Sequence, residues 1–214
     1  MIKHIHVVLP ILYSYMRCPY AMRARMALNL AGVEVEIREI SLRDKPAHML
    51  QVSPKGSVPV LVLQDGSVID ESLEIMFFAL QKNAAGLEHS SANLGGNIHA
   101  HAGVLMLEND NSFKQALDAY KYPEKHPEKS QIQHRAEGEV FLQKLENLLE
   151  INTYLLQATP SLVDIAIFPF IRQFAAVDNA WFENANYPKL RAWLNDWINS
   201  ELFKSVMQKR AVDR

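Results

Sequence analysis

The sequence of 214 residues is poor in cysteine and carries no excess of positive charge. Its single cysteine excludes an internal disulfide and a cysteine-rich zinc site, so a disulfide-stapled secreted domain is not expected. Lysine and arginine number 22 against 24 aspartates and glutamates, a net charge of −2. That balance argues against nucleic acid and against an acidic membrane surface as partners. A small-molecule partner is the remaining expectation.

The sequence also lacks a long hydrophobic run. Residues 165–171 form an apolar stretch that is far shorter than the ~20 residues needed to span a bilayer. The N-terminal run 7–12 is broken by Pro10 and is followed by no small-residue cleavage site, so we do not expect a secretion signal. The sequence therefore predicts a cytoplasmic protein without a membrane partner.

The remaining composition is that of a globular protein. Hydrophobic residues make up 49% of the chain and charged residues 21%, which excludes wholesale disorder. The length suits two small domains. We predict a mixed α/β domain over residues 1–81, a linker rich in glycine, serine and asparagine over 82–96, and an all-helical domain over 97–214.

Hydrophobic patterns predict the order β-α-β-loop-β-β-α in the first domain. Alternation and turn residues mark the strands, and a left-handed cap at Gly32 ends the first helix. The predicted elements are strand 10–14, helix 21–31, strand 33–37, hairpin 58–63 with 68–69, and helix 73–80.

Helical periodicity dominates the second half of the chain. Long helices are predicted over 98–120 and 128–157, the second opened by Pro127. Ser161 with Asp164 forms a capping box ahead of a third helix, and Pro188 opens a fourth. These helices predict a bundle.

Cys18 is the residue with the clearest chemical potential. It lies between a strand end and a helix start, where unpaired backbone N–H groups and the helix dipole favour an anion. This placement lowers the pKa of a thiol from ~8.5 to as little as ~3.5–7.5. Arg17, Arg23 and Arg25 add positive charge nearby, although Arg23 and Arg25 alone are also typical of a solvated helix face. A buried structural cysteine is the alternative, but we favour a reactive thiol.

The residue at position 21 restricts the chemistry of this thiol. A redox dithiol motif would have its second cysteine there, and the sequence has Ala21. A mixed disulfide on Cys18 must then be resolved by a second thiol molecule, for which glutathione is the abundant cytosolic candidate.

Two further segments suggest ligand contacts and also have ordinary structural explanations. Pro59 at the head of a strand suits either a cis bond, which would turn Val58 toward a peptide-like ligand, or the commoner trans bond. Glu71 and Ser72 open a helix, so they serve either as its cap or as contacts for a γ-glutamyl ammonium and carboxylate.

In combination these motifs resemble those of the cytosolic glutathione transferases, and most of all the cysteine-dependent, omega-like and glutaredoxin-like bacterial branch. The resemblance covers nearly the whole chain in order. The motifs are Tyr13-Ser14, Cys18-Pro19-Tyr20-Ala21, Ser57-Val58-Pro59-Val60-Leu61, Asp70-Glu71-Ser72 and Ser161-Leu162-Val163-Asp164.

The resemblance implies a thioredoxin-like domain followed by a helical-bundle domain, with glutathione as co-substrate and no metal. It implies that Cys18 is the nucleophile and that Val58 and Pro59 bind the cysteinyl backbone of glutathione. Glu71 and Ser72 would hold the γ-glutamyl group. Lys45 resembles the lysine that omega-like members direct at the glycyl carboxylate, although a surface lysine is a competing interpretation. A homodimer stays open.

The leading hypothesis is therefore a glutathione-dependent thiol transferase or reductase acting on a small or protein-bound disulfide. Conjugation of glutathione to electrophiles ranks second, with Tyr13, Ser14 or Tyr15 as candidate hydroxyl donors. A non-catalytic adaptor would need a degraded glutathione site. Histidines two apart, at His4 with His6 and His99 with His101, have metal-like spacing but point in different directions on a helix, so no metal site is expected.

Overall fold

In a computed structural model that describes residues 8–82 and 96–213, the chain folds as two units. The first joins residues 1–86 to the C-terminal residues 205–214, and the second spans residues 87–204. The predicted linker 82–96 lies almost wholly outside the described residues, as do His4 and His6. The return of 205–214 to the first unit differs from the predicted boundaries, because its short strand has no recognisable hydrophobic pattern.

The first unit is built on a five-stranded mixed sheet of order β4-β3-β1-β2-β5. Strand β1 pairs in parallel with β2 and antiparallel with β3, while β3 and β4 form the predicted hairpin. The strands are β1 Ile11–Ser14, β2 Glu36–Ile40, β3 Val60–Val62, β4 Val68–Ile69 and β5 Val212–Asp213. Strand β5 extends the sheet beyond β2, in parallel with it.

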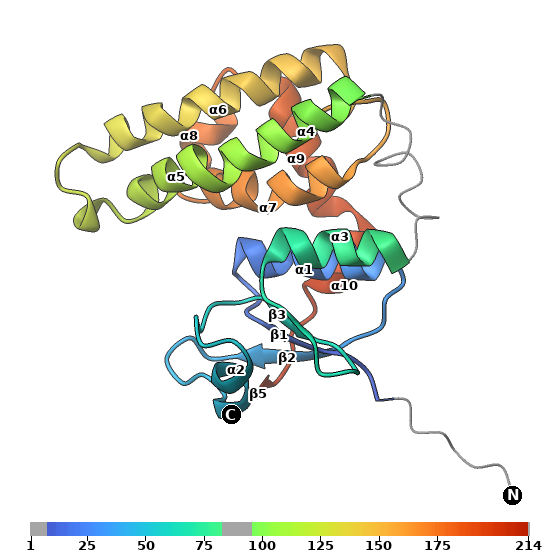
Figure 1. Ribbon diagram of the computed structural model, residues 1–214. Coiled ribbons are helices and arrows are strands. Elements are labelled where there is room, and N and C mark those ends of the chain that lie inside the picture. Colours follow the sequence, from blue (N-terminus) through green and yellow to red (C-terminus); the bar gives the residue numbers. More distant parts are fainter. Residues whose placement is uncertain (1–7, 83–95, 214) are drawn as a thin grey trace, which may run out of the picture. The chain divides into compact units, whose positions relative to one another are not determined.

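Helices cover both faces of this sheet. Helices α1 (Pro19–Leu30) and α3 (Ser72–Lys82) pack against each other on one face, and α2 (Ala47–Val52) lies on the other side (Figure 1). The sequence pattern predicts a loop at α2, since its six residues carry too little periodicity to indicate a helix. The thioredoxin-like fold predicted for this domain is confirmed.

The turn after α1 explains why β2 begins later than predicted. Gly32 adopts φ of 66°, the left-handed conformation expected of a cap, and the amide of Val33 donates back to the carbonyl of Leu28 at 2.9 Å. This cap occupies Val33, so pairing starts at Glu36 rather than at 33.

Over its described residues 96–204, the second unit has only helical secondary structure, as predicted. Its first long helix is interrupted by a π-helical turn, and its second is shorter than predicted. Ser130 caps the second long helix in a capping box with Gln133, so the helix begins at Gln131 rather than at Pro127. The elements are α4 Gly96–Glu108, η1 Asn109–Phe113, α5 Lys114–Lys121, η2 Pro123–Lys125, α6 Gln131–Ile151, α7 Leu162–Ala175, α8 Asn179–Asn184, α9 Pro188–Asn199 and α10 Glu201–Val206.

Buried carboxylates anchor the helix starts of this unit. Asp164 accepts hydrogen bonds from the amide and hydroxyl of Ser161, which confirms the predicted capping box of α7. Asp164 also accepts from the amide of Leu155 at 3.0 Å and from Trp193 Nε1 at 2.8 Å. Glu146 of α6 accepts from the amides of Lys189 and Leu190, at the start of α9. Each carboxylate therefore joins a helix N-terminus to a second element.

Where the structure describes the chain, no helix is long and apolar enough to cross a membrane.

Candidate active site

Cys18 occupies the N-cap position of α1, with Pro19 as the first helical residue. Its amide donates to the carbonyl of Tyr15 at 3.0 Å, and its carbonyl accepts from Met22 at 2.9 Å. The side chain is a half-buried thiol that forms no disulfide. These features put the sulfur at the positive end of the helix dipole, where a thiolate is favoured.

The Cys18 thiol lies next to the segment that contains Val58 and Pro59. Cys18 Sγ lies 3.7 Å from the carbonyl oxygen of Val58, and the peptide bond between Val58 and Pro59 is cis. The sequence had left cis and trans open. Val58 itself is buried, and β3 begins directly after Pro59. The fold thus brings Cys18 next to Val58 and Pro59, although Val58 lies 40 residues further along the sequence.

The two arginines of α1 are not on a solvated face. Arg23 is 1% exposed and Arg25 is 3% exposed, so the solvated-face alternative is wrong. Arg23 donates from Nε and Nη2 to the hydroxyl of Ser72, at 3.1 and 2.8 Å. Arg25 donates to the backbone carbonyls of Tyr15 and Met16 in the loop before Cys18. Both guanidinium groups therefore donate hydrogen bonds to residues of the first unit.

Ser72 and Glu71 differ from a simple helix cap. The carbonyl of Glu71 accepts the amide of Ile75, so Glu71 occupies the cap position and Ser72 is the first residue of α3. Ser72 is 4% exposed and its hydroxyl accepts from Arg23, which replaces the capping role that sequence analysis considered. The Glu71 side chain is 64% exposed and pairs with Lys55 Nζ at 2.5 Å.

Lys55 is not predicted as a site residue, because the sequence shows only a lysine beside Gly56. In the fold it bridges three acceptors, because its ammonium also donates to the carbonyl of Asp70 at 2.6 Å and lies 3.8 Å from the Asp70 carboxylate. Only the approach of residues 53–56 to residues 70–71 reveals it.

Lys45 reaches the segment that leads into Val58. Gly56 adopts φ of 63°, and a Cβ atom placed on it would lie 3.5 Å from Lys45 Nζ. The ammonium therefore lies over Gly56, two residues before Val58. Lys45 therefore lies near the start of the segment that contains Val58 and Pro59.

The hydroxyls considered for conjugation chemistry are mostly engaged elsewhere. Tyr13 is fully buried and its hydroxyl hydrogen-bonds His48 Nδ1 at 2.7 Å. The Ser14 hydroxyl is also buried and accepts from Arg25. Tyr15 is partly exposed, and its hydroxyl accepts from Arg17 Nε at 3.2 Å. Tyr15 alone of the three remains within reach of solvent.

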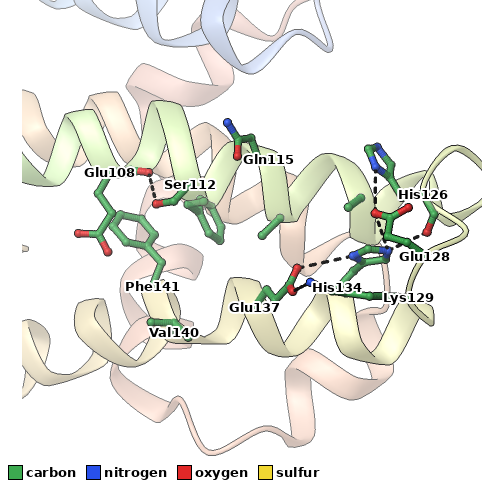
Figure 2. A pocket seen from close by; sticks show the side chains of 13 residues that line it. Glu108, Ser112, Gln115, His126, Glu128, Lys129, His134, Glu137, Val140 and Phe141 are labelled. Carbon is green, nitrogen blue, oxygen red and sulfur yellow. Dashed lines mark hydrogen bonds and ion pairs between the residues drawn. The ribbon is translucent and has the colours of Figure 1, made fainter.

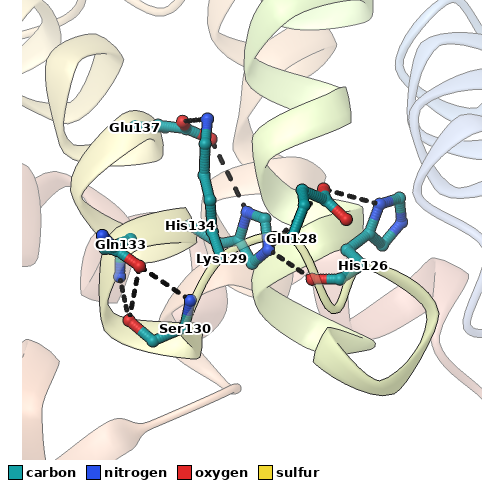
Figure 3. Close-up of polar contacts among 7 residues, drawn as sticks. All are labelled: His126, Glu128, Lys129, Ser130, Gln133, His134 and Glu137. Carbon is teal, nitrogen blue, oxygen red and sulfur yellow. Dashed lines mark hydrogen bonds and ion pairs between the residues drawn. The ribbon is translucent and has the colours of Figure 1, made fainter.

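The second unit has a hollow of about 620 Å³ between α5, the 126–129 loop and α6 (Figure 2). His134 is 2% exposed and bonds the His126 carbonyl through Nε2 at 2.9 Å, while its Nδ1 faces the Glu137 carboxylate at 3.6 Å. Glu137 also pairs with Lys129 (Figure 3). None of the predicted site residues lines this hollow. Its polar groups fasten the 126–130 loop to the first turns of α6.

Metal ligation finds no support in the described ranges 8–82 and 96–213, where no group of three or more histidine, cysteine, aspartate or glutamate side chains could hold an ion. His101 lies on α4, and the side chain of His99 is outside the described part of the chain.

Comparisons with protein families match both units. Residues 12–86 match the glutathione S-transferase N-terminal domain, and residues 133–196 match the glutathione S-transferase C-terminal domain. Glutathione S-transferase L3 of Arabidopsis thaliana is 27% identical over 207 residues, which cover 89% of this chain and 78% of that protein. Glutathione S-transferase omega-1 of Sus scrofa is 40% identical over 60 residues, which are 28% of this chain and 25% of that protein.

Solved structures show the same fold at low identity. The glutathione transferase URE2P6 from Phanerochaete chrysosporium, solved in complex with oxidized glutathione, superposes with a TM-score of 0.80 at 18% identity and covers 94% of this chain and 96% of that one. Glutathione transferase Omega 3C from Trametes versicolor gives 0.75 at 23% identity, covering 95% and 90%. With both family domains matched in order on the expected folds, the chain belongs to the glutathione S-transferase superfamily.

Proposed function

We propose that this protein is a glutathione-dependent thiol transferase whose nucleophile is Cys18. The observation that carries the proposal is the position of the thiol: it is in no disulfide, half-buried, at the N-cap of α1 and 3.7 Å from the Val58 carbonyl before cis Pro59. A peptide-like ligand paired with Val58 would present its own sulfur beside Cys18 Sγ. That arrangement suits disulfide exchange.

The reaction has two balanced steps. The Cys18 thiolate attacks the glutathionyl sulfur of a mixed disulfide, forming a Cys18–glutathione disulfide and expelling the other sulfur as a thiolate, which takes up a proton. A second glutathione thiolate then attacks the glutathionyl sulfur, giving oxidised glutathione and restoring the Cys18 thiolate. Cys18 is the sole cysteine of the chain, so no internal thiol competes with the second step.

Residues around the thiol suit the remaining parts of glutathione. Val58 and Pro59 would pair with the cysteinyl backbone, and Lys45 over Gly56 would meet the glycyl carboxylate. Glu71 would receive the γ-glutamyl ammonium. An exposed ion pair contributes about 0–1 kcal/mol, so the ligand ammonium can replace Lys55 on Glu71 at little cost.

Ser72 would act at the same end of the ligand. Its hydroxyl proton is free to point at a carboxylate while its oxygen accepts from Arg23. Together with the first amides of α3, it would bind the γ-glutamyl carboxylate.

The named relatives fit this assignment. Omega-type transferases appear among both sequence relatives and solved structures, and one structural neighbour was solved with oxidized glutathione. We assign the chain to the cysteine-type, omega-like branch, acting in the cytoplasm on a small or protein-bound disulfide. Conjugation is disfavoured because Tyr13 and Ser14 are buried with their hydroxyls engaged.

Turnover with two substrates tests the proposal. The wild type should reduce hydroxyethyl disulfide in the presence of glutathione, and Cys18→Ala should lose this activity while keeping its retention on immobilised glutathione. Cys18→Ala that gained conjugation of a chloronitrobenzene at the expense of reduction would fit the proposal. Full reductase activity in Cys18→Ala would refute it.

The γ-glutamyl contacts need a separate experiment. Ser72→Ala should weaken glutathione binding by about tenfold to a hundredfold, since it removes a buried partner worth roughly 1–3 kcal/mol. Glu71→Gln should weaken it by up to about fivefold, because an exposed ion pair contributes only about 0–1 kcal/mol. Cysteinylglycine lacks the γ-glutamyl group, so calorimetric titration should show its affinity unchanged. Equal weakening of both thiols would mean that the two residues act only through the stability of α3.

A further inference from the structure

The C-terminal segment of the chain returns to the first unit beside the loop that carries Cys18. Helix α10 ends at Val206, and β5 then pairs in parallel with β2 at Glu39 and Ile40. The same end of β2 supplies the buried carboxylate of Glu39, which is 6% exposed. The segment 206–213 therefore lies against an element that contacts the Cys18 loop.

Arg25 connects this segment to the loop through a single guanidinium group. On the loop side it donates to Ser14 Oγ at 2.5 Å, to the Tyr15 carbonyl at 3.4 Å and to the Met16 carbonyl at 2.9 Å. On the other side its Nε donates to the Val206 carbonyl at 3.2 Å, and Nη2 lies 3.7 Å from Met207 Sδ.

Met16, two residues before Cys18, is hydrogen-bonded through both its backbone carbonyl and its backbone amide. Its carbonyl accepts from Arg25, and its amide donates to Glu39 Oε1 at 2.5 Å. A buried cation and a buried anion thus fix one peptide of the loop. Charge-assisted hydrogen bonds of this kind are stronger than neutral ones and orient their partners.

We propose that Arg25, together with Val206 and Met207 of the C-terminal segment, positions the Cys18 thiolate. The guanidinium needs acceptors on both sides to stay buried, so docking of Val206 and Met207 holds Arg25 against the loop. The loop then holds Cys18 at the N-cap of α1 with a fixed positive charge in range. The importance of this placement for catalysis rests on the proposed function, whereas its effect on the thiol does not.

The electrostatics agree with this geometry. Burial lowers the pKa of Arg25 to about 10, while Glu39 and an ionised Cys18 act to raise it and the charge of Arg210 acts to lower it. Arg25 therefore stays charged near neutral pH and interacts with the sulfur. An ionised Cys18 and the Arg25 charge attract each other, so the buried guanidinium favours the thiolate over the thiol.

Alkylation of Cys18 is the decisive readout, since the chain has one cysteine and the reaction needs no glutathione. The rate constant with iodoacetamide is measured against pH for the wild type, Arg25→Gln, Arg25→Lys and a chain ending after Lys204. Arg43→Gln, an exposed arginine after β2, is the matched control. We expect alkylation at pH 7 to slow about tenfold in Arg25→Gln and in the truncated chain, as a smaller thiolate fraction requires. Arg25→Lys should lie between them and the wild type.

A second truncation separates the two contacts of the segment. A chain ending after Met207 keeps both Arg25 acceptors and loses residues 208–214, among them β5 and Arg210. It should alkylate nearly as fast as the wild type. If the chain ending after Lys204 does not fold, Arg25→Lys still tests the proposal. This variant changes the hydrogen-bond geometry of residue 25 and keeps its positive charge. In turnover, Arg25→Lys should lower kcat with KM for glutathione almost unchanged.

The outcomes are distinct. Unchanged alkylation profiles in folded Arg25→Lys and Arg25→Gln would overturn the proposal and leave Arg25 a purely structural residue. Slowed alkylation in a protein whose wild type shows no disulfide reduction would support the positioning role and refute the proposed function instead.

Discussion

Both units bury charged side chains, but they use them differently. In the first unit, the buried groups Arg23, Arg25 and Glu39 hydrogen-bond to the Ser72 hydroxyl and to the loop before Cys18. In the second unit, the buried carboxylates Asp164 and Glu146 accept from backbone amides at helix starts. Substitutions should therefore alter sulfur chemistry in the first unit and stability in the second.

The largest effect on stability is expected from Asp164→Ala. A lost N-cap costs about 0.5–2 kcal/mol, and Asp164 also satisfies the buried amide of Leu155 and the indole of Trp193. We expect a loss of about 3 kcal/mol in the free energy of unfolding, since each orphaned buried donor costs roughly 1–3 kcal/mol. Burial raises the pKa of this carboxyl and the four hydrogen bonds oppose the rise. Urea titration gives the loss, and the exposed Asp196→Ala is the control.

The comparison of the two units would fail if this variant, while still folded, changed the alkylation rate of Cys18. The two effects should be separable, because Asp164 hydrogen-bonds to Leu155, Ser161 and Trp193, which all belong to the second unit.

Glu146→Ala should rank next. It removes the acceptor for the amides of Lys189 and Leu190, which lie 3.0 and 2.7 Å from its two oxygens. A loss of about 2 kcal/mol follows from leaving these groups unpaired. Glu150→Ala, four residues further along the same helix and exposed, is the matched control and should change the unfolding midpoint little. Equal losses in both variants would show that helix propensity, rather than the link to α9, is responsible.

Two glycines make opposite predictions in the second unit. At Gly138 of α6 an added Cβ would lie 2.4 Å from Phe174 Cε2, so Gly138→Ala should cost about 1–3 kcal/mol through overpacking. At Gly103 of α4 nothing lies within 4 Å, so Gly103→Ala should stabilise by about 0.5–1 kcal/mol through its helix preference. Thermal melts of the pair test the sign of each effect. A stabilised Gly138→Ala would contradict the packing of α6 on α7.

The smallest effect is expected at Ser130. Its hydroxyl accepts from the amide of Gln133 in an exposed capping box, so Ser130→Ala should cost about 1 kcal/mol. Chemical denaturation of Ser130→Ala and Ser130→Asp checks it, because aspartate restores the acceptor and should recover the stability. No recovery in Ser130→Asp would place the start of α6 elsewhere.

Much of the fold followed from sequence patterns because those patterns are local. The alternating strands, the cap at Gly32, the capping box at Ser161 and the helix opened by Pro188 all depend on neighbouring residues. Strand β5 could not be predicted, since two residues show no alternation and its pairing depends on a distant strand. The start of α6 was misjudged because Pro127 was preferred over the better cap at Ser130.

The candidate site was predictable to the same extent. Cys18, Pro59, Glu71 and Ser72 stand in recognisable motifs, whereas Arg25, Glu39 and Lys55 acquire their importance only from contacts across the sheet and between loops. Arginine is usually exposed, so burial of Arg23 and Arg25 has no signal in the sequence. The long-range partners of a charge are what sequence reasoning misses.

We propose that Cys18 exchanges a disulfide with glutathione. Intact-protein mass spectrometry after incubation with oxidised glutathione tests it most directly, because one cysteine allows one adduct. We predict a single glutathionyl group on Cys18 that forms at neutral pH and is removed by added reduced glutathione. An unmodified chain under these conditions, or an adduct that reduced glutathione does not remove, would contradict the claim.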